Sequence, residues 1–323
     1  MRVWLKRLSF MLILLSAILM AMVRVGFFYT PIARLSYPDR GDLDFYVNCT
    51  RYIPLDQPPV VPVLLFIFNL ALANSILTVL SCMVFAYALI YYVMFQLAVT
   101  YTGSIIASVS MFFLVIYSDT TLSPTALKNL FGVAFILLIL LLLPSFMEGK
   151  RKESFAFIAL SILALFVHSA TSFLLLPIYF VYSLKNLKNH RLLTVLGLFL
   201  IAVLLVSFTP LSSKGWVVLS DFVRDPLTVF INNLVFNSLI IEQFCYSTVL
   251  LSSIIMLLFL EHKELFISCA VVGLLCYFLP SVAYAGRMRE TAMPFIGLLF
   301  AFEIKMLLTL CKRLLTLFKE RKT

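Results

Sequence analysis

The chain is poor in charged residues and lacks the common signatures of soluble enzymes. Only 12% of its 323 residues are Asp, Glu, Lys or Arg. It contains no phosphate-binding glycine-rich loop, no serine nucleophile elbow and no HExxH motif, which are the signatures of nucleotide hydrolysis, serine acyl transfer and zinc proteolysis. The sequence therefore gives no support to those three classes of enzyme.

Cysteine is also sparse and has no informative spacing. The six cysteines form no CxxC pair, and most of them lie within apolar runs. In such surroundings Cys behaves as a small hydrophobic residue. We therefore expect no disulfide framework.

Apolar residues dominate what is present. They make up 63% of the chain, the mean hydropathy is +1.07, and apolar runs recur from one end to the other. Only segments that satisfy their own backbone hydrogen bonds can cross a bilayer. We therefore predict an all-α transmembrane bundle, one integral membrane domain over residues 1–323, with roughly 9–11 membrane segments that include short or re-entrant helices. The first run, Phe10 to Phe28, is too long and bulky for a signal-peptide core, so we expect it to be retained.

The formal net charge of +10 comes from basic clusters between the apolar runs. Such clusters orient helices, with Lys and Arg on the cytoplasmic side, so nucleic acid is not expected as a partner. The sequence predicts a multi-pass protein of the cell membrane with both termini in the cytoplasm. The four clusters are Arg2, Lys6 and Arg7; Lys150, Arg151 and Lys152; Lys185, Lys188 and Arg191; and Lys312, Arg313, Lys319, Arg321 and Lys322.

This orientation places residues 29–58 outside as a loop, and residues 210–242 outside as a loop or surface helix. The second and third clusters are about 30 residues apart, too few for two full spans, so we expect two short helices that turn at His168-Ser169-Ala170-Thr171. Glu303 and Lys305 are expected at the inner boundary of the last helix. Residues 60–117 look like three apolar runs. The predicted orientation places the segments before and after them on the same side of the membrane, which requires two or four crossings. One run is therefore a pair of half-helices or a surface segment.

An acidic motif, Pro38-Asp39-Arg40-Gly41-Asp42-Leu43-Asp44-Phe45-Tyr46, follows the first apolar run. Carboxylates are costly near lipid, which makes a functional site the default hypothesis at a membrane boundary. The alternative interpretation is a solvated loop that simply favours Asp.

The predicted orientation brings many of the remaining polar residues to the outer face. Each has an ordinary explanation: Arg287 and Arg289 can anchor a helix end by snorkelling, and His168 can donate a hydrogen bond to a neighbouring helix. The residues at this face are Asp39, Arg40, Asp42, Asp44, Asp56, Asp119, His168, Arg287, Arg289 and Glu290.

An Asp-x-Asp-x-Tyr motif in the first outer loop precedes Asp56-Gln57-Pro58-Pro59 at the start of the next apolar run. This arrangement resembles the GT-C superfamily of polyprenyl-phosphate-dependent membrane glycosyltransferases. Asp119 matches a second acidic position, and the His168 turn and Arg287/Arg289 are similar to polar positions of polysaccharide polymerases. The chain departs from better-known members because it is shorter and has no soluble outer domain.

The resemblance implies transfer of a sugar from a lipid phosphate, with membrane lipid and the polyprenyl-phosphate sugar donor as partners. Asp42 or Asp44 would be the general base, and Arg287 and Arg289 would hold the leaving phosphate. Asp119 and His168 complete the candidate catalytic set, and Arg40, Asp56 and Glu290 are candidate substrate-binding residues.

A divalent metal is left open by the sequence. Asp42, Asp44 and Asp119 offer the oxygen ligands that Mg or Mn prefers. The resemblance implies equally that many such enzymes work without a metal, so no cofactor is assigned.

Other functions also stay open: a polysaccharide polymerase of the O-antigen or exopolysaccharide type, a transporter or flippase, and a non-catalytic subunit of a membrane complex. A transporter would carry ionisable groups near the bilayer midplane. In a subunit the charges would serve only as anchors.

Overall fold

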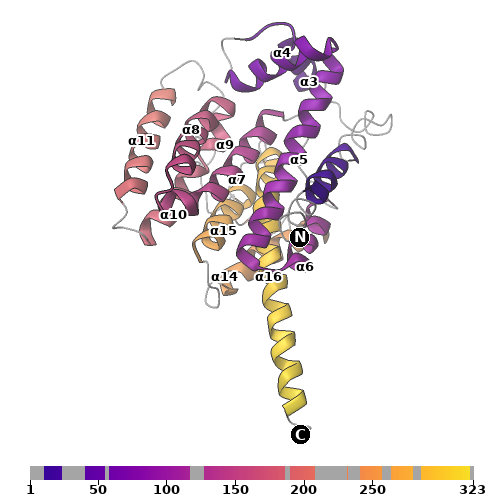
Figure 1. Ribbon diagram of the computed structural model, residues 1–323, viewed down its shortest axis with the longest axis vertical. Helices are drawn as coiled ribbons and strands as arrows, with labels where there is room; N and C mark the ends of the chain where they lie inside the picture. Colours follow the sequence, from indigo (N-terminus) through magenta and orange to yellow (C-terminus); the bar gives the residue numbers. More distant parts are fainter. Residues whose placement is uncertain are drawn as a thin grey trace, which may run out of the picture.

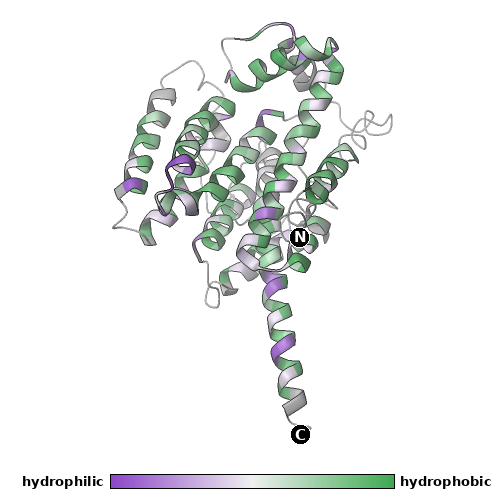
Figure 2. Cartoon of the chain, viewed as in Figure 1, coloured by the Kyte–Doolittle hydropathy of each residue, from purple (hydrophilic) through white to green (hydrophobic). Residues whose placement is uncertain are grey.

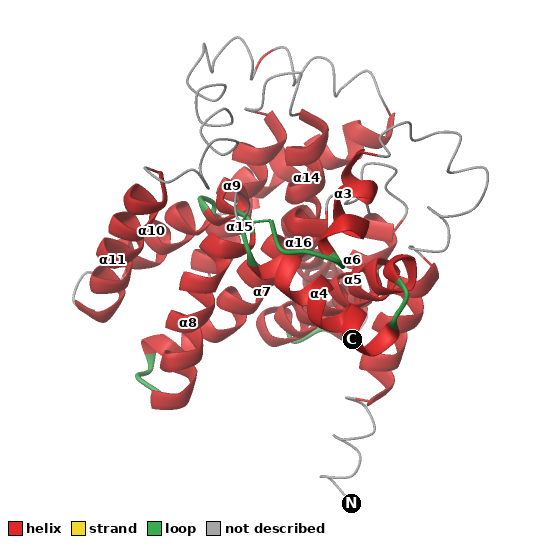
Figure 3. Ribbon diagram, turned by 90° about the horizontal axis from the view of Figure 1, so that it is seen from above, coloured by secondary structure: helices red, strands yellow, loops and turns green. Residues whose placement is uncertain are grey.

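The computed structural model describes residues 11–23, 41–54, 58–116, 127–185, 190–207, 231, 241–256, 263–278 and 285–320. Within these ranges the protein is helical, joined by short turns, and contains no strand (Figures 1 and 3). The helices are Met11–Val23, α3 (Gly41–Cys49), α4 (Val60–Leu72), α5 (Ser75–Thr102), α6 (Ile105–Ile116), α7 (Leu127–Met147), α8 (Arg151–Val167), α9 (Ser169–Ser172), α10 (Leu175–Lys185), α11 (His190–Ser207), α14 (Ile241–Met256), α15 (Lys263–Phe278) and α16 (Ala285–Glu320). The all-α prediction therefore holds for the described chain.

Among the described residues, three helices are long and apolar enough to cross a membrane: Ser75–Thr102, Leu127–Met147 and Thr291–Leu317, the last within α16. Large apolar side chains are also exposed on the surrounding shorter helices, such as Leu70 at 72% and Phe155 at 78%. Figure 2 shows apolar residues over most of the bundle, including its outer helices. Exposed apolar surface of this extent fits a lipid environment better than water.

The centre of the bundle is built on α7. This helix is apolar on all sides, as expected for a helix surrounded by others, and it packs against α5 and α8. The last helix, α16, packs against α15 and α6. These contacts bring the middle and the end of the chain together.

A tight turn separates α4 from α5. Ala73 ends α4 with a left-handed φ of 49°, and the Asn74 side chain caps α5 by accepting a hydrogen bond from the Leu77 amide at 3.0 Å. With 13 residues, α4 is shorter than the roughly 20 needed to cross a bilayer. It lies with α3 at one end of the bundle (Figure 1). Of the two alternatives for residues 60–117, this favours a surface segment.

The two ends of α7 define the two ends of the bundle. Its first turn contacts α3, and we call this the α3 end. Its last turn leads into the Glu148–Lys152 turn, about 30 Å away by helical rise, and we call this the Lys150 end.

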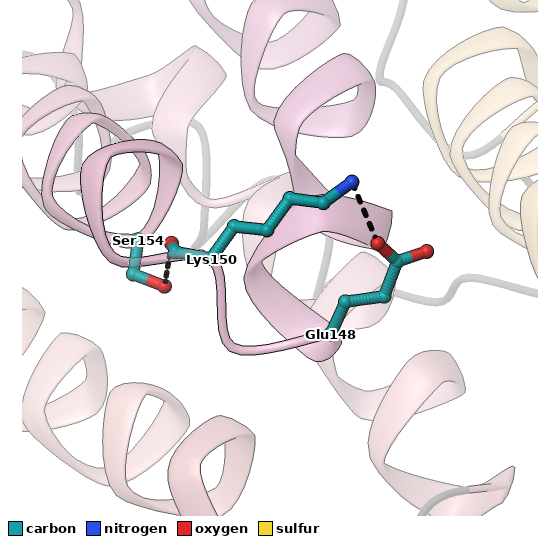
Figure 4. A network of polar contacts seen from close by, with 3 residues as sticks. All are labelled: Glu148, Lys150 and Ser154. Carbon is teal, nitrogen blue, oxygen red and sulfur yellow. Dashed lines mark hydrogen bonds and ion pairs between the residues drawn. The ribbon is translucent and has the colours of Figure 1, made fainter.

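Basic residues from two predicted clusters meet at the Lys150 end. Lys150 Nζ forms an ion pair with Glu148 Oε2 at 2.8 Å, and the Ser154 hydroxyl donates to the Lys150 carbonyl at 2.7 Å (Figure 4). The Arg191 guanidinium lies beside Gly149. The hydrogen bond with Glu148 raises the pKa of Lys150, so this residue stays cationic at neutral pH.

Two short helices lie between these clusters. Here α8 has 17 residues and α10 has 11, separated by the His168 turn and α9. They pack through a hydrogen bond between Ser161 and Tyr179 at 2.6 Å. The predicted pair of short helices is confirmed in this part of the chain.

Two expectations for the outer segments have different outcomes. Residues 29–58 were expected to be a loop, but residues 41–49 within them form α3. Residues 210–242 lie almost entirely outside the described residues.

Candidate functional site

A buried polar network joins α7, α9 and α16 at the α3 end. Asn129, in the first turn of α7, is 6% exposed. Its Oδ1 accepts a hydrogen bond from the Thr171 hydroxyl at 2.8 Å, and its Nδ2 donates to Thr291 Oγ1 at 2.9 Å. One amide thus links two helices that the sequence places far apart.

His168 belongs to the same network. It ends α8 in an extended conformation, and its Nδ1 contacts the Thr171 hydroxyl and accepts a hydrogen bond from the Thr171 backbone N–H at 3.2 Å. The hydroxyl and the backbone N–H of Thr171 thus both lie against this ring nitrogen, which ties the His168 ring to Asn129 through Thr171.

The His168 turn can approach α7 closely because residue 132 is glycine. A Cβ at Gly132 would lie 3.0 Å from Thr171 Cβ and 3.3 Å from His168 Cβ. The turn is also fixed from within, since the Ser172 hydroxyl donates to the carbonyls of Ala164 at 2.5 Å and His168 at 2.9 Å.

Helix α3 contacts the first turn of α7 through two aromatic residues. The Lys128 backbone N–H donates to Tyr46 Oη at 3.2 Å, and Lys128 Nζ lies 4.4 Å from the centre of the Phe45 ring. The second contact is a cation–π interaction. Lys128 is therefore a cation held beside the helix that carries the acidic motif.

The other end of α3 is held by α4 and α5. Asn69 Nδ2 donates to the Thr50 carbonyl at 3.2 Å, and Asn69 Oδ1 accepts from Thr78 at 3.2 Å. The Thr50 hydroxyl donates to Ser75 Oγ at 2.7 Å. Two sets of contacts therefore fix the position of α3.

The predicted site residues fall into three groups. Arg40, Asp56 and Asp119 lie outside the described residues, as does Asp39. For Asp42, Asp44, Arg287, Arg289 and Glu290 the helical backbone is described. His168 is described in full and lies in the network.

The helical register separates the two aspartates of the motif. Position 42 lies one turn before Tyr46, on the same face of α3, whereas position 44 is two residues from Tyr46 and lies on the opposite face. The sequence left Asp42 and Asp44 as equal candidates for the base. The register favours Asp42, because Tyr46 faces α7.

The same reasoning applies to the start of α16. Position 287 lies one turn before Thr291 on the same face of the helix, and position 289 lies on the opposite face. Thr291 contacts Asn129. Position 287 therefore lies on the side of α16 that faces the polar network, and position 289 does not.

Sequence reasoning missed Lys128, Asn129 and Thr291. A signal was present for the first of these, because Lys128 is the only charged residue between Asp119 and Glu148. Asn129 follows it directly at the start of a long apolar helix, where a buried amide requires partners. Nothing in the local sequence identifies Thr291 as one of them.

The metal hypothesis concerns Asp42, Asp44 and Asp119. Asp119 lies outside the described residues, and positions 42 and 44 lie on opposite faces of α3. Among the described residues, no group of three or more His, Cys, Asp or Glu side chains could hold a metal ion.

A second polar contact lies deeper in the bundle. Glu303, expected at the inner boundary of the last helix, is only 9% exposed and lies within the span Thr291–Leu317. Its Oε1 accepts a hydrogen bond from the Ser252 hydroxyl of α14 at 2.5 Å. Helix α14 packs over this part of α16 and covers the carboxyl group, and the place of Glu303 at the inner boundary stays a prediction.

Comparisons with protein-family models, with curated proteins and with solved structures found no match to this chain.

Proposed function

We propose that the protein is a membrane glycosyltransferase that uses a polyprenyl-phosphate-linked sugar donor at the α3 end. The observation that supports this is the meeting of four segments there: α3, the first turn of α7, the His168 turn and the start of α16. They are joined by the contacts of Tyr46 with Lys128 and of Asn129 with Thr171 and Thr291. These segments carry or adjoin most of the polar residues on which the GT-C resemblance rests.

In the proposed reaction the acceptor hydroxyl attacks the anomeric carbon of the donor sugar. A new carbon–oxygen bond forms, and the bond from the sugar to the phosphate oxygen breaks. The hydroxyl proton passes to the Asp42 carboxylate, and the polyprenyl phosphate leaves with the bonding electrons. Asp42 is chosen over Asp44 because of its position on the Tyr46 face of α3.

Negative charge grows on the phosphate as it leaves, and cations near it stabilise the transition state. Arg287 can bind two phosphate oxygens at once. Lys128 adds a point charge in the first turn of α7, where the helix dipole also favours an anion. The side chains proposed for this task therefore come from the starts of two helices that Asn129 holds together.

The proposed topology assigns the α3 end and the Lys150 end to opposite sides of the membrane. The α3 end faces the outside, the Lys150 end faces the cytoplasm, and both termini are cytoplasmic. The Lys150 turn and Arg191 support this, because two basic clusters lie side by side at the Lys150 end. We retain roughly 9–11 membrane segments, with α8 and α10 as short ones.

The test is donor turnover by the purified full chain in nanodiscs, using a panel of polyprenyl-phosphate and polyprenyl-diphosphate sugars. Asp42→Asn keeps size and removes the charge, so turnover should fall on the order of a hundredfold or more. Asp44→Asn is the matched control two residues away and should have a smaller effect. Turnover unchanged in both variants would contradict the proposal. A polysaccharide polymerase would differ by extending a lipid-linked glycan.

A transporter is the second candidate, and Glu303 is the observation that favours it. Intramembrane carboxyl groups commonly mark ion or substrate pathways, and this one is buried between α14 and α16. Glu303→Gln should abolish substrate movement in proteoliposomes if the protein is a transporter, and should leave glycosyl transfer intact if it is the proposed enzyme. Glu148→Gln, in the exposed turn, is the matched control.

A further inference from the structure

The last part of α16 leaves the packed bundle. Residues 291–303 are buried except for the half-buried Phe300, whereas residues 311–317 are exposed, and Figure 1 shows the helix projecting alone toward the C-terminus. We call residues 306–320 the C-terminal extension. Five of its leucines are between 43% and 62% exposed: Leu307, Leu310, Leu314, Leu315 and Leu317.

The extension consists largely of a seven-residue unit that occurs twice. Residues 307–313 read LLTLCKR and residues 314–320 read LLTLFKE, so five of the seven positions are identical. The lysine of the unit also occurs one period earlier, giving Lys305, Lys312 and Lys319. A period of seven keeps equivalent residues on one side of a helix.

The repeat divides the helix into two faces. At about 100° per residue, the apolar positions of the unit cover an arc of roughly 160°, and the Thr, Lys and Arg or Glu positions cover the rest. Figure 2 shows apolar and hydrophilic residues on this part of α16. An arc this wide exceeds the narrow seam of a two-stranded coiled coil and is typical of helices at a membrane interface.

The charge of the C-terminal extension favours an anionic membrane over a second copy of the chain as its binding partner. From Lys312 to the C-terminus there are five basic residues and one acidic residue, Glu320. Two copies aligned in parallel would bring like charges together, and two heptads are fewer than the three or four that a coiled coil needs. Anionic headgroups complement the basic face.

The position of the C-terminal extension relative to the membrane is set by the rest of α16. The candidate span Thr291–Leu317 has 27 residues, and about 20 are enough for the hydrocarbon core. The second unit therefore begins near the membrane boundary. Helix α16 runs without interruption to Glu320. We propose that on an anionic bilayer it bends near this boundary, so that the C-terminal extension binds the membrane surface, with its leucines among the acyl chains and Lys312, Arg313 and Lys319 on anionic lipid headgroups.

The experiment uses spin labels on the full-length chain in nanodiscs, with the native cysteines replaced. Leu314→Cys lies at the centre of the apolar arc, and Thr316→Cys lies two residues away on the other face. With phosphatidylglycerol present, the label at 314 should collide mainly with oxygen and the label at 316 mainly with a water-soluble nickel complex. The difference should shrink in phosphatidylcholine alone.

Lys312→Gln, Arg313→Gln and Lys319→Gln together remove three positive charges. They should reduce the ratio of membrane-bound to free C-terminal extension on the order of a hundredfold, since each charge contributes roughly a factor of five. Glu320→Gln, which leaves them intact, should not weaken binding. Equal access of the nickel complex to both labels in anionic nanodiscs would overturn the proposal. Shielding of position 314 from both reagents, with spin–spin broadening between chains, would overturn it in favour of a second copy.

Discussion

Asn129 of α7 donates a hydrogen bond from Nδ2 to Oγ1 of Thr291 in α16 at 2.9 Å, across 162 positions of sequence. The same amide accepts a hydrogen bond from Thr171. Because all three side chains are buried, their partners cannot be replaced by water without opening the bundle. The start of α16, with Arg287 one turn before Thr291, is thereby held against α7.

Removing the amide should destabilise the protein. Asn129→Leu leaves the hydroxyls of Thr171 and Thr291 without this partner, so we expect a loss of about 1–3 kcal/mol in the free energy of unfolding. Thermal unfolding in detergent measures it. Thr316→Val, whose hydroxyl bonds only to the Lys312 carbonyl of its own exposed turn among the described contacts, should change little, and an equal effect of both substitutions would contradict the role of the network.

Two glycines should respond to alanine with opposite signs. Gly132→Ala places a Cβ 3.0 Å from Thr171 Cβ in a turn fixed by hydrogen bonds, so overpacking should cost about 1–3 kcal/mol. Gly197→Ala meets nothing within 4 Å in α11 and should stabilise the helix by roughly 0.5–1 kcal/mol. Chemical denaturation of both variants checks the signs, and a neutral Gly132→Ala would show that the His168 turn can move away from α7.

Lys128 should contribute to donor binding through its charge. Lys128→Gln removes the charge next to α3, and we expect donor affinity to fall roughly tenfold, in line with the loss of a hydrogen bond to a charged group. Lys128→Arg should retain most of the affinity. Lys150→Gln, at the opposite end of α7, is the control. Isothermal titration with the donor lipid distinguishes these variants, and equal affinities for Lys128→Gln and wild type would remove Lys128 from the site.

The two arginines of α16 should differ when changed to lysine. Lysine keeps the charge but lacks the planar fork that binds two phosphate oxygens. We expect Arg287→Lys to lower turnover at least tenfold, whereas Arg289→Lys, on the other face of the helix, should be nearly silent. Anchoring by snorkelling predicts that both are silent, so wild-type kinetics in both variants would favour anchoring.

The proposed topology can be checked with impermeant thiol reagents in a background without the six native cysteines. Gly41→Cys, at the start of α3, should be labelled from outside intact cells. Glu148→Cys, in the exposed turn at the Lys150 end, should be labelled only after the membrane is opened. Labelling of Gly41→Cys only from the cytoplasmic side would reverse the proposed orientation and remove the outer-face site.

Individual helices were predictable where one physical signal dominates. The apolar run Leu130 to Phe146 becomes α7 because a long apolar segment must satisfy its backbone internally. The short distance between the Lys150 and Lys185 clusters correctly indicated two short helices around His168. The motif at Asp42 and Asp44 was expected in a loop, and its helical form was missed because Asp and Gly are poor helix formers and the contacts that hold α3 come from α4, α5 and α7.

The sequence by itself therefore determined the helical class, the positions of the long apolar segments and the basic clusters between them, since hydropathy and charge act locally along the chain. It did not determine which polar residues meet. Asn129 reaches Thr291 only because α7 and α16 lie together in the bundle, and Glu303 is buried only because α14 covers it. Position 42 is separated from position 44 only because α3 is a helix with one face on Lys128. These relationships depend on packing between distant segments, which leaves no local trace in the order of residues.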